Sequence, residues 1–214
     1  MSQPEAKSGG NMLREDCLKT LAGHYSGQLV VSVYTTCFEW MAICSQAINY
    51  VSVGAMGQAG SHALGLALGR PDQEVWVFDG DGSLLMNLGS LVTLAGMQPR
   101  NLTHFVFQNG SYEANQRMPL PVAEVDFAGI ARGAGIASTA QFRDTASLDA
   151  WLASRKPMTG RDGPSLVDLR VLPSPRPYPQ HYDHIHSAEA RESFKAALRA
   201  IPVEASGARA GARV

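Results

Sequence analysis

The chain has 214 residues, of which 45% are hydrophobic, and a formal net charge of −1. This length is typical of one domain with a substantial core, which buries roughly 70% of the surface of the unfolded chain. Nucleic-acid binding is not expected, because contacts to phosphates need clustered Lys and Arg. The apolar runs are shorter than the roughly 20 residues of a membrane span, and the N-terminus lacks the apolar stretch of a signal peptide. We therefore expect a cytoplasmic protein that neither binds nucleic acid nor enters a membrane.

Short β-branched runs alternate with segments of helical periodicity along most of the chain. This alternation predicts an α/β fold, a three-layer α/β/α sandwich with a mainly parallel sheet. We expect one domain over residues 13–202, with disordered tails at 1–12 and 203–214. Strands are predicted at 29–34, 50–53, 75–78, 102–107 and 165–171, and helices at 38–47, 61–68, 84–95, 125–134, 147–154 and 188–200.

A glycine-rich loop at residues 54–60 follows the predicted strand at 50–53. Taken alone, such a loop is typical of a turn into a helix, with glycines that allow close packing of the helix on the sheet. It lacks the Gly-x-Gly-x-x-Gly spacing of a dinucleotide site, because Met56 stands where the second glycine is required. The interpretation of this loop therefore depends on the loops that follow.

A second glycine loop, Gly80-Asp81-Gly82-Ser83, comes directly after the predicted strand at 75–78. It also lacks the third glycine of a dinucleotide site, and the chain contains no P-loop sequence. Its glycines allow the backbone to come close to a diphosphate, and the helix that follows offers N–H groups and a positive dipole end to an anion. An isolated Gly-Asp-Gly is more often a simple turn, so a second signal is needed.

That signal is a polar loop at residues 108–111, QNGS, which follows the predicted strand at 102–107. Parallel strands joined through a helix bring their carboxyl ends to one edge of the sheet, so this loop and the loop at 80–83 should lie side by side. Asp81 and Asn109 would then offer one charged and one neutral oxygen. These are ligands that Mg²⁺ takes together with phosphate oxygens and water. The two loops therefore predict a site for a metal ion and a diphosphate.

The two loops resemble the signature of thiamine-diphosphate enzymes, which begins with Gly-Asp-Gly and ends in paired asparagines. The first asparagine of that pair is Gln108 here, whereas the second, which binds the metal in the family, is kept as Asn109. The resemblance implies the thiamine-diphosphate-binding fold and Mg²⁺ ligands from Asp81, Asn109 and the Ser111 carbonyl. It also implies cofactor contacts from residues of both loops, namely Gly80, Gly82, Ser83, Asn109 and Ser111.

The loop at 54–60 resembles the part of this family that holds the aminopyrimidine end of the cofactor. By that resemblance the backbone of Gly54 and Met56 binds the pyrimidine ring, and the Met56 side chain supports the bent cofactor. Tyr112, next to the metal loop, is expected to join Met56 as a catalytic residue. The expected cofactors are thiamine diphosphate and Mg²⁺.

The resemblance to the diphosphate-binding domain of thiamine-diphosphate enzymes covers about residues 25–175. Within this family, the short chain is similar to the separate β subunits of sulfopyruvate and phosphonopyruvate decarboxylases. Residues 54–57, 112–113 and 119–121 fit this group, whereas residues 114–118 depart from its glycine-rich version. The resemblance implies decarboxylation of a small 2-oxoacid. It also implies a partner α subunit that binds the pyrimidine ring and supplies the activating glutamate, in an α2β2 or larger hetero-oligomer.

Two other functions stay open at this point. An acetolactate-synthase-like carboligase subunit would share the same loops. A non-catalytic regulatory module that binds thiamine diphosphate would share the fold, although such a module gains nothing from keeping the charged metal ligand Asp81. Glu39 and Glu113 are the acids nearest to the loops, and ordinary structural roles are favoured for both.

Arg117 and a histidine cluster have no assigned role. Arg117 lies just past the metal loop, and its planar guanidinium would bind a carboxylate or phosphonate well, but an ordinary solvated Arg is favoured. His181, His184 and His186 follow a proline-rich stretch and lack a fourth ligand at a zinc spacing, so a solvated loop is expected there.

Overall fold

A computed structural model of the chain describes residues 12–51, 56–122, 124–175, 178–180, 182–185 and 187–203. Its centre is a seven-stranded sheet made of β1 (Met12–Leu13), β2 (Leu29–Ser32), β3 (Ile48–Val51), β4 (Val75–Gly80), β5 (Leu102–Gln108), β8 (Ser138–Phe142) and β9 (Ser165–Leu172). The strands follow the order β1-β9-β5-β4-β2-β3, and β8 also pairs with β9. All of these pairs are parallel, which confirms the predicted type of sheet.

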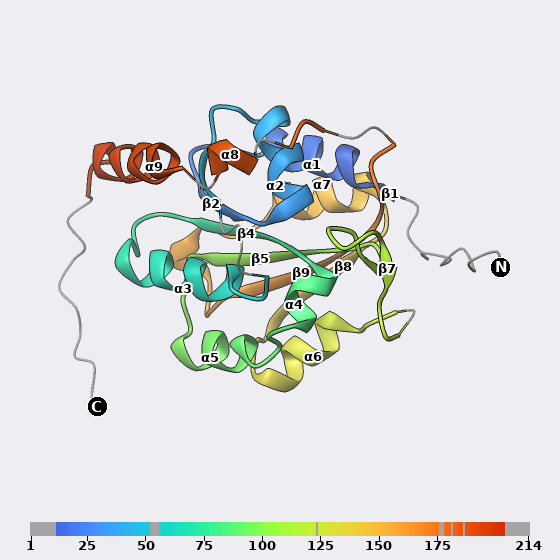
Figure 1. The fold of residues 1–214 in the computed structure, drawn as a ribbon. Coiled ribbons are helices and arrows are strands. Elements are labelled where there is room, and N and C mark those ends of the chain that lie inside the picture. The colour runs from blue at the N-terminus through green and yellow to red at the C-terminus, as the bar shows by residue number, and fades with distance from the viewer. Residues whose placement is uncertain are drawn as a thin grey trace.

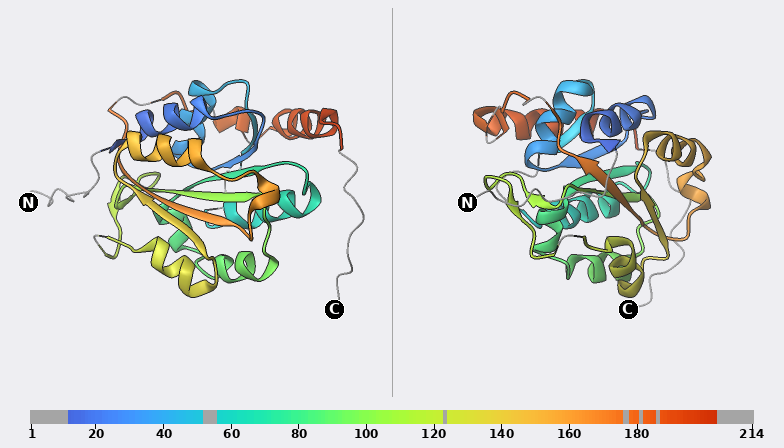
Figure 2. Two further views of the ribbon diagram at one scale, coloured as in Figure 1. Left: turned by 180° about the vertical axis from the view of Figure 1, so that it is seen from behind. Right: turned by 90° about the vertical axis from the view of Figure 1, so that its right-hand side faces the viewer.

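Helices cover both faces of the sheet, as Figure 1 shows. One face carries α1 (Arg14–Gly23), α2 (Tyr34–Ile43) and α7 (Thr145–Ser154), and the other carries α3 (Ala59–Gly69), α4 (Asp81–Leu85), α5 (Ser90–Met97) and α6 (Phe127–Ala134). The view from behind shows the same three layers (Figure 2). The chain ends with α8 (Tyr182–Ile185) and α9 (Ala188–Ala200), and α9 packs along the edge strand β3. The three-layer α/β/α prediction is confirmed.

Two apolar clusters, one on each face, hold the helices on the sheet. Successive strand residues point to opposite faces, so Val75 and Val77 of β4 belong to one cluster and Trp76 and Phe78 to the other. All four side chains are buried, and each contributes roughly 1.5–3 kcal/mol relative to an exposed position. A parallel sheet buried on both faces requires such continuous apolar strands, which is why the sequence pattern located them.

Several predicted elements are present with shifted ends. The helix expected over 38–47 is α2, which begins at Tyr34 and ends at Ile43. It begins early because the Cys37 N–H donates to the Val33 carbonyl at 3.2 Å, so the first turn forms directly behind β2. The strand expected at 50–53 begins earlier, at 48, and its last two residues lie outside the described part of the chain.

The prediction of one helix over 84–95 is wrong, because α4 ends at Leu85 and α5 begins only at Ser90. Asn87 occupies the break. Its side-chain amide donates to the Gly57 carbonyl at 3.0 Å, and its own carbonyl accepts the Ser90 hydroxyl at 2.7 Å. The pattern still identified the buried face, which is formed by Leu84, Leu91 and Leu94.

Some elements were not predicted at all. They are β1, α1, β8, α8 and a two-stranded antiparallel hairpin made of β6 (Ser111–Tyr112) and β7 (Met118–Pro119). β8 has the polar sequence STAQF and is partly exposed, so it lacks an apolar run. Met12, expected in the N-terminal tail, is buried and pairs with Val171. The rest of the expected tails, apart from Val203, lies outside the described residues, among which no helix is long and apolar enough to cross a membrane.

The hairpin packs closely on α4 at the carboxyl edge of the sheet. The Tyr112 ring lies so near to Gly82 that a Cβ atom there would come within 2.5 Å of Cδ1 of the ring. At Gly80, by contrast, no atom lies within 4 Å of the corresponding Cβ position. Glycine is therefore required for packing at only one of these two positions.

We predict that Gly82→Ala destabilises the chain while Gly80→Ala does not. The added methyl group must displace the Tyr112 ring, and overpacking of this kind costs roughly 1–3 kcal/mol. The matched Gly80→Ala change adds a methyl group in open space and should stay within about 0.5 kcal/mol of the wild type. Thermal unfolding without ligands measures both, and equal melting temperatures for the two variants would contradict the packing of Tyr112 on Gly82.

Candidate functional site

Loops from several strands converge on a pocket at the carboxyl edge of the sheet, where α4 and the β6–β7 hairpin lie in Figure 1. Residues 33–36 line it after β2, residues 80–83 at the end of β4, and residues 111–114 after β5, together with Met56 and Arg14. β3 and β4 lie on opposite sides of β2, so the order of the strands reverses at this point. Open α/β sheets bind ligands in the crevice outside such a reversal.

Asp81 joins the two predicted loops. Its Oδ1 accepts the Gly82 N–H at 2.8 Å, and its Oδ2 accepts the Gly110 N–H at 2.7 Å. The carboxylate is buried, and this burial raises the pKa of Asp81 to about 6, although the backbone N–H groups act in the opposite direction. A divalent cation beside the carboxylate would favour its charged form. Gly110 has a φ of 77°, a backbone conformation that favours glycine.

Asn109 lies next to this contact and lines the same pocket. Its Oδ1 accepts the backbone N–H of Ser111 at 2.9 Å and the Ser111 hydroxyl at 3.1 Å. Its Nδ2 donates to Oε2 of Glu113 at 3.1 Å. The structure thus brings together Asp81, Asn109 and Ser111, the three predicted metal ligands, on adjacent loops.

Gln108, which replaces the first asparagine of the signature, is bound inside the fold. Its Nε2 donates to the Val125 carbonyl at 3.0 Å and to Oδ1 of Asp168 at 3.1 Å. Its Oε1 accepts Nη1 of Arg170 at 2.7 Å. The substitution therefore affects the connection to α6 and β9, and leaves Asn109 in place.

The loop that leads into α3 contacts the Gly80–Ser83 loop directly. The Gly57 N–H donates to Oγ of Ser83 at 2.9 Å, and a hydroxyl that accepts one hydrogen bond can still donate another. Met56 lines the pocket, as do Gly80, Gly82, Ser83 and Tyr112. Gly54 lies outside the described residues.

Arg14 lines the pocket and was not predicted. It lies at the start of α1 and binds Glu39 through Nε and Nη2, both at 2.8 Å, and Glu113 through Nη1 at 2.5 Å. Burial alone would lower the pKa of Arg14, but the two carboxylates raise it overall, so the guanidinium stays charged. Glu39 and Glu113 are both bound in ion pairs, in agreement with the structural roles favoured for them.

The turn after β2 was also missed, because the predicted strand at 29–34 runs through it. Tyr34 has a φ of 42°, an unusual conformation for a large side chain, which costs about 1–3 kcal/mol and is enriched at functional sites. Thr35 and Thr36 follow at the start of α2 and line the pocket. These residues can be identified as part of the pocket only from the reversal of strand order at β2, which the topology of the folded chain shows.

The residues at this edge fit a magnesium ion and a diphosphate. No group of three or more His, Cys, Asp or Glu that could hold a metal occurs among the described residues. One carboxylate with neutral oxygens is instead the sparse protein set that Mg²⁺ uses when phosphate oxygens and water complete its shell. The backbone at Gly80 leaves room for such a group, because no atom lies within 4 Å of the position that a Cβ atom would take there, whereas the Tyr112 ring fills that space at Gly82.

The remaining polar residues of interest are not among those that line the pocket, or they lie outside the described residues. Arg117 is exposed at the tip of the hairpin and has no ion pair within the described part of the chain. His184 belongs to α8, whereas His181 and His186 lie outside the described residues.

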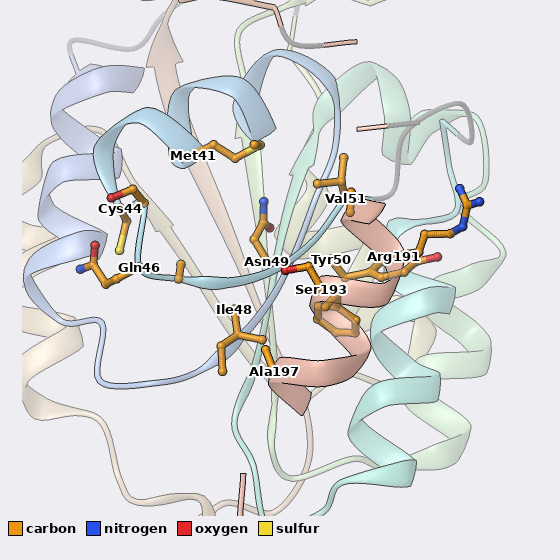
Figure 3. A pocket seen from close by; sticks show the side chains of 14 residues that line it. Met41, Cys44, Gln46, Ile48, Asn49, Tyr50, Val51, Arg191, Ser193 and Ala197 are labelled. Atoms are coloured by element: carbon orange, nitrogen blue, oxygen red, sulfur yellow. The ribbon is translucent and has the colours of Figure 1, made fainter. Parts of the chain in front are cut away.

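A separate cavity of about 510 Å³ lies between the end of α2, β3 and α9 (Figure 3). Tyr50, Asn49 and Arg191 are among its lining residues. It contains none of the predicted site residues, and no Asp or Glu occurs among the described residues that line it. Its described lining therefore lacks the carboxylate ligand that Asp81 would supply in the other pocket.

Comparison with known proteins agrees with this geometry. Residues 27–169 match the family described as thiamine pyrophosphate enzyme, C-terminal TPP binding domain. The chain is 36% identical over 125 residues to a phosphonopyruvate decarboxylase from Streptomyces hygroscopicus, which covers 58% of this chain and 30% of that protein. It is 30% identical over 161 residues to the sulfopyruvate decarboxylase subunit beta from Methanothermobacter thermautotrophicus, which covers 75% of this chain and 82% of that subunit.

A solved structure shows the same fold. The thiamine diphosphate-dependent 4-hydroxybenzoylformate decarboxylase of Rhodococcus jostii RHA1 superimposes with a TM-score of 0.61 at 18% identity, over 77% of this chain and 33% of that one. The chain thus spans about a third of the length of that enzyme and of the phosphonopyruvate decarboxylase. Since the family match covers more than half of the residues, the chain belongs to the thiamine pyrophosphate enzymes, in the family of their C-terminal TPP-binding domain.

Proposed function

We propose that the chain is the diphosphate-binding β subunit of a thiamine-diphosphate-dependent 2-oxoacid decarboxylase of the sulfopyruvate or phosphonopyruvate type. The observation that carries this proposal is the buried Asp81 carboxylate, which bridges the two signature loops beside Asn109. The names of the two decarboxylase relatives support the reaction class. The 82% coverage of a separate beta subunit supports the assignment as a subunit.

Each residue of the site has a role in this proposal. Asp81, Asn109 and the Ser111 carbonyl bind Mg²⁺, and the glycine loop with Ser83 binds the diphosphate. The bound cofactor supplies the electron sink that lets carbon dioxide leave. Met56 would support the cofactor from the α3 side of the pocket, and Tyr112, which packs on Gly82, would contact it from the hairpin side.

We also propose an obligate partner subunit that binds the pyrimidine ring and supplies the activating glutamate. Glu39 and Glu113, the acids nearest to the loops, both bind the same guanidinium. An acid held in such a pair is poorly placed to activate another group. The complex is an α2β2 or larger assembly in which each site lies between two subunits.

Replacement of Asp81 tests the metal site. We expect Asp81→Asn to weaken Mg²⁺-dependent binding of thiamine diphosphate by roughly 100-fold or more, because loss of one partner of a buried charge pair costs about 3–5 kcal/mol. Asp162→Ala is the control, since this exposed aspartate precedes β9 at the opposite end of the sheet. Calorimetry on the assembled complex gives both affinities, and an unchanged affinity in Asp81→Asn would refute the assignment.

Activity should require the partner. The isolated chain, given thiamine diphosphate, Mg²⁺ and 2-oxoacids that include sulfopyruvate and phosphonopyruvate, should release no carbon dioxide, and the partner subunit should restore release. Robust turnover by the chain alone would show that the activating acid is internal, with Glu39 and Glu113 the first to test. Condensed products in place of the simple aldehyde would indicate a carboligase, and binding without turnover in the complex would indicate a regulatory module.

Arg117 is the candidate group for recognition of the charged end of the substrate. Gln116 and Arg117 have φ angles of 56° and 57°, in a turn closed by a hydrogen bond of 3.2 Å from the Met118 N–H to the Asn115 carbonyl. Each of these two left-handed conformations costs roughly 1–2 kcal/mol of stability relative to glycine at the same position. Arg117 keeps this strained conformation and makes no ion pair with the described residues. We therefore propose that its charge binds the substrate and does not stabilise the fold.

Two substitutions by glycine distinguish a role of Arg117 in substrate binding from an effect on stability. Gln116→Gly and Arg117→Gly should both raise the melting temperature of the chain, because glycine adopts this conformation freely. Only Arg117→Gly should raise the KM for an anionic 2-oxoacid, by roughly tenfold for one lost charge-assisted hydrogen bond. Steady-state kinetics of the complex provides the measurement, and an unchanged KM in Arg117→Gly would leave Arg117 as an ordinary solvated residue.

A further inference from the structure

Arg14 reaches the metal loop from a helix that the signature does not include. We propose that Arg14 is a positioning residue for the metal ligand Asn109 and that it acts through Glu113. This inference rests on the proposed function, because it concerns the site that binds Mg²⁺ and the diphosphate. It follows from a continuous chain of contacts that begins at α1 and ends at the loop after β5.

The first link fixes the guanidinium. Arg14 and Glu39 have side chains that are only 3% and 2% exposed, and they are joined by two hydrogen bonds of 2.8 Å. A paired contact of this kind defines the plane and the position of the guanidinium, which a single contact does not. Glu39 belongs to α2, so the guanidinium is anchored to the helical layer that carries α1 and α2.

The second link carries this position to the metal loop. Arg14 holds Glu113 through Nη1 at 2.5 Å and Nη2 at 3.2 Å, and Oε2 of Glu113 in turn accepts Nδ2 of Asn109 at 3.1 Å. An ionised carboxylate only accepts hydrogen bonds, so the amide nitrogen must face Glu113. Together with the Ser111 backbone N–H, which donates to the amide oxygen at 2.9 Å, this contact selects one of the two orientations of the Asn109 amide. The opposite orientation would replace the metal-binding oxygen by an NH₂ group, which is no ligand for Mg²⁺.

The charges of the network also complement a divalent ion. Arg14 is surrounded by Glu39 and Glu113, and Asp81 lines the same pocket. One cation and three carboxylates leave a formal excess of two negative charges. Without Arg14, the two glutamates would face each other uncompensated, and Glu113, which is 15% exposed, could turn away toward solvent.

A purely structural role is the alternative, in which Arg14 only ties α1 to α2. Such a role affects stability, whereas a positioning role affects the metal affinity through Asn109 in particular. The test therefore needs a measurement of metal binding that does not depend on turnover.

The experiment uses the full chain assembled with its partner subunit. Mn²⁺ binding followed by electron paramagnetic resonance, with and without thiamine diphosphate, compares the wild type with Arg14→Met, Arg14→Lys and Arg70→Met. We expect Arg14→Met to weaken Mn²⁺ binding by about 10–100-fold, the usual effect of losing a group that orients a metal ligand. Arg14→Lys should recover part of the loss, because it keeps the charge without the planar fork. Arg70→Met, which breaks a somewhat more exposed ion pair with Asp72, should leave Mn²⁺ binding unchanged.

A double-mutant cycle tests the path through Asn109. If Arg14 acts through this residue, Arg14→Met combined with Asn109→Ala should bind Mn²⁺ no more weakly than Asn109→Ala alone. A full additive loss in the double variant, or an Arg14→Met variant with a lower melting temperature and normal Mn²⁺ affinity, would overturn the inference. A wild-type complex that binds neither Mn²⁺ nor thiamine diphosphate would refute the proposed function itself, and this inference with it.

Discussion

The buried carboxylate of Asp81 is the interaction on which the site depends. A carboxylate away from water is costly unless its oxygens are hydrogen-bonded, and here each oxygen accepts a backbone N–H from a different loop, at 2.8 and 2.7 Å. The parallel pairing of β4 with β5 makes this possible, because it brings the ends of both strands to the same edge. The pKa of Asp81 is raised because burial increases it more than the backbone hydrogen bonds lower it. A bound cation would lower the pKa again by favouring the charged carboxylate.

Both helical layers hold this edge in place. From the layer of α1 and α2, Arg14 reaches over the end of the sheet to Glu113 and thereby to Asn109. From the opposite layer, the loop before α3 donates the Gly57 N–H to Ser83. The pocket therefore lies where the two layers meet at the reversal of strand order, and we expect changes in either layer to reach the proposed metal ligands.

The parts of the fold that the sequence predicted are those set by neighbours along the chain. Buried parallel strands are continuous apolar runs, and the loops with Asp81 and Asn109 follow them directly, so short patterns located both. The role of Arg14 was not predicted because its partner Glu113 lies 99 residues away, and no sequence periodicity encodes such a contact. The break between α4 and α5 at Asn87 was not predicted for the same reason, since it depends on a contact with Gly57, 30 residues upstream. β8 was not predicted because this partly exposed polar strand is held by its pairing with β9 and has no apolar run.

The most direct test of this account is a crystal structure of the complex with thiamine diphosphate, with Mn²⁺ in place of Mg²⁺ and located by its anomalous scattering. We expect one ion that contacts the Asp81 carboxylate, the Asn109 side-chain oxygen and the diphosphate. An ion bound elsewhere, or a diphosphate that approaches the sheet without contacting the loops after β4 and β5, would contradict it.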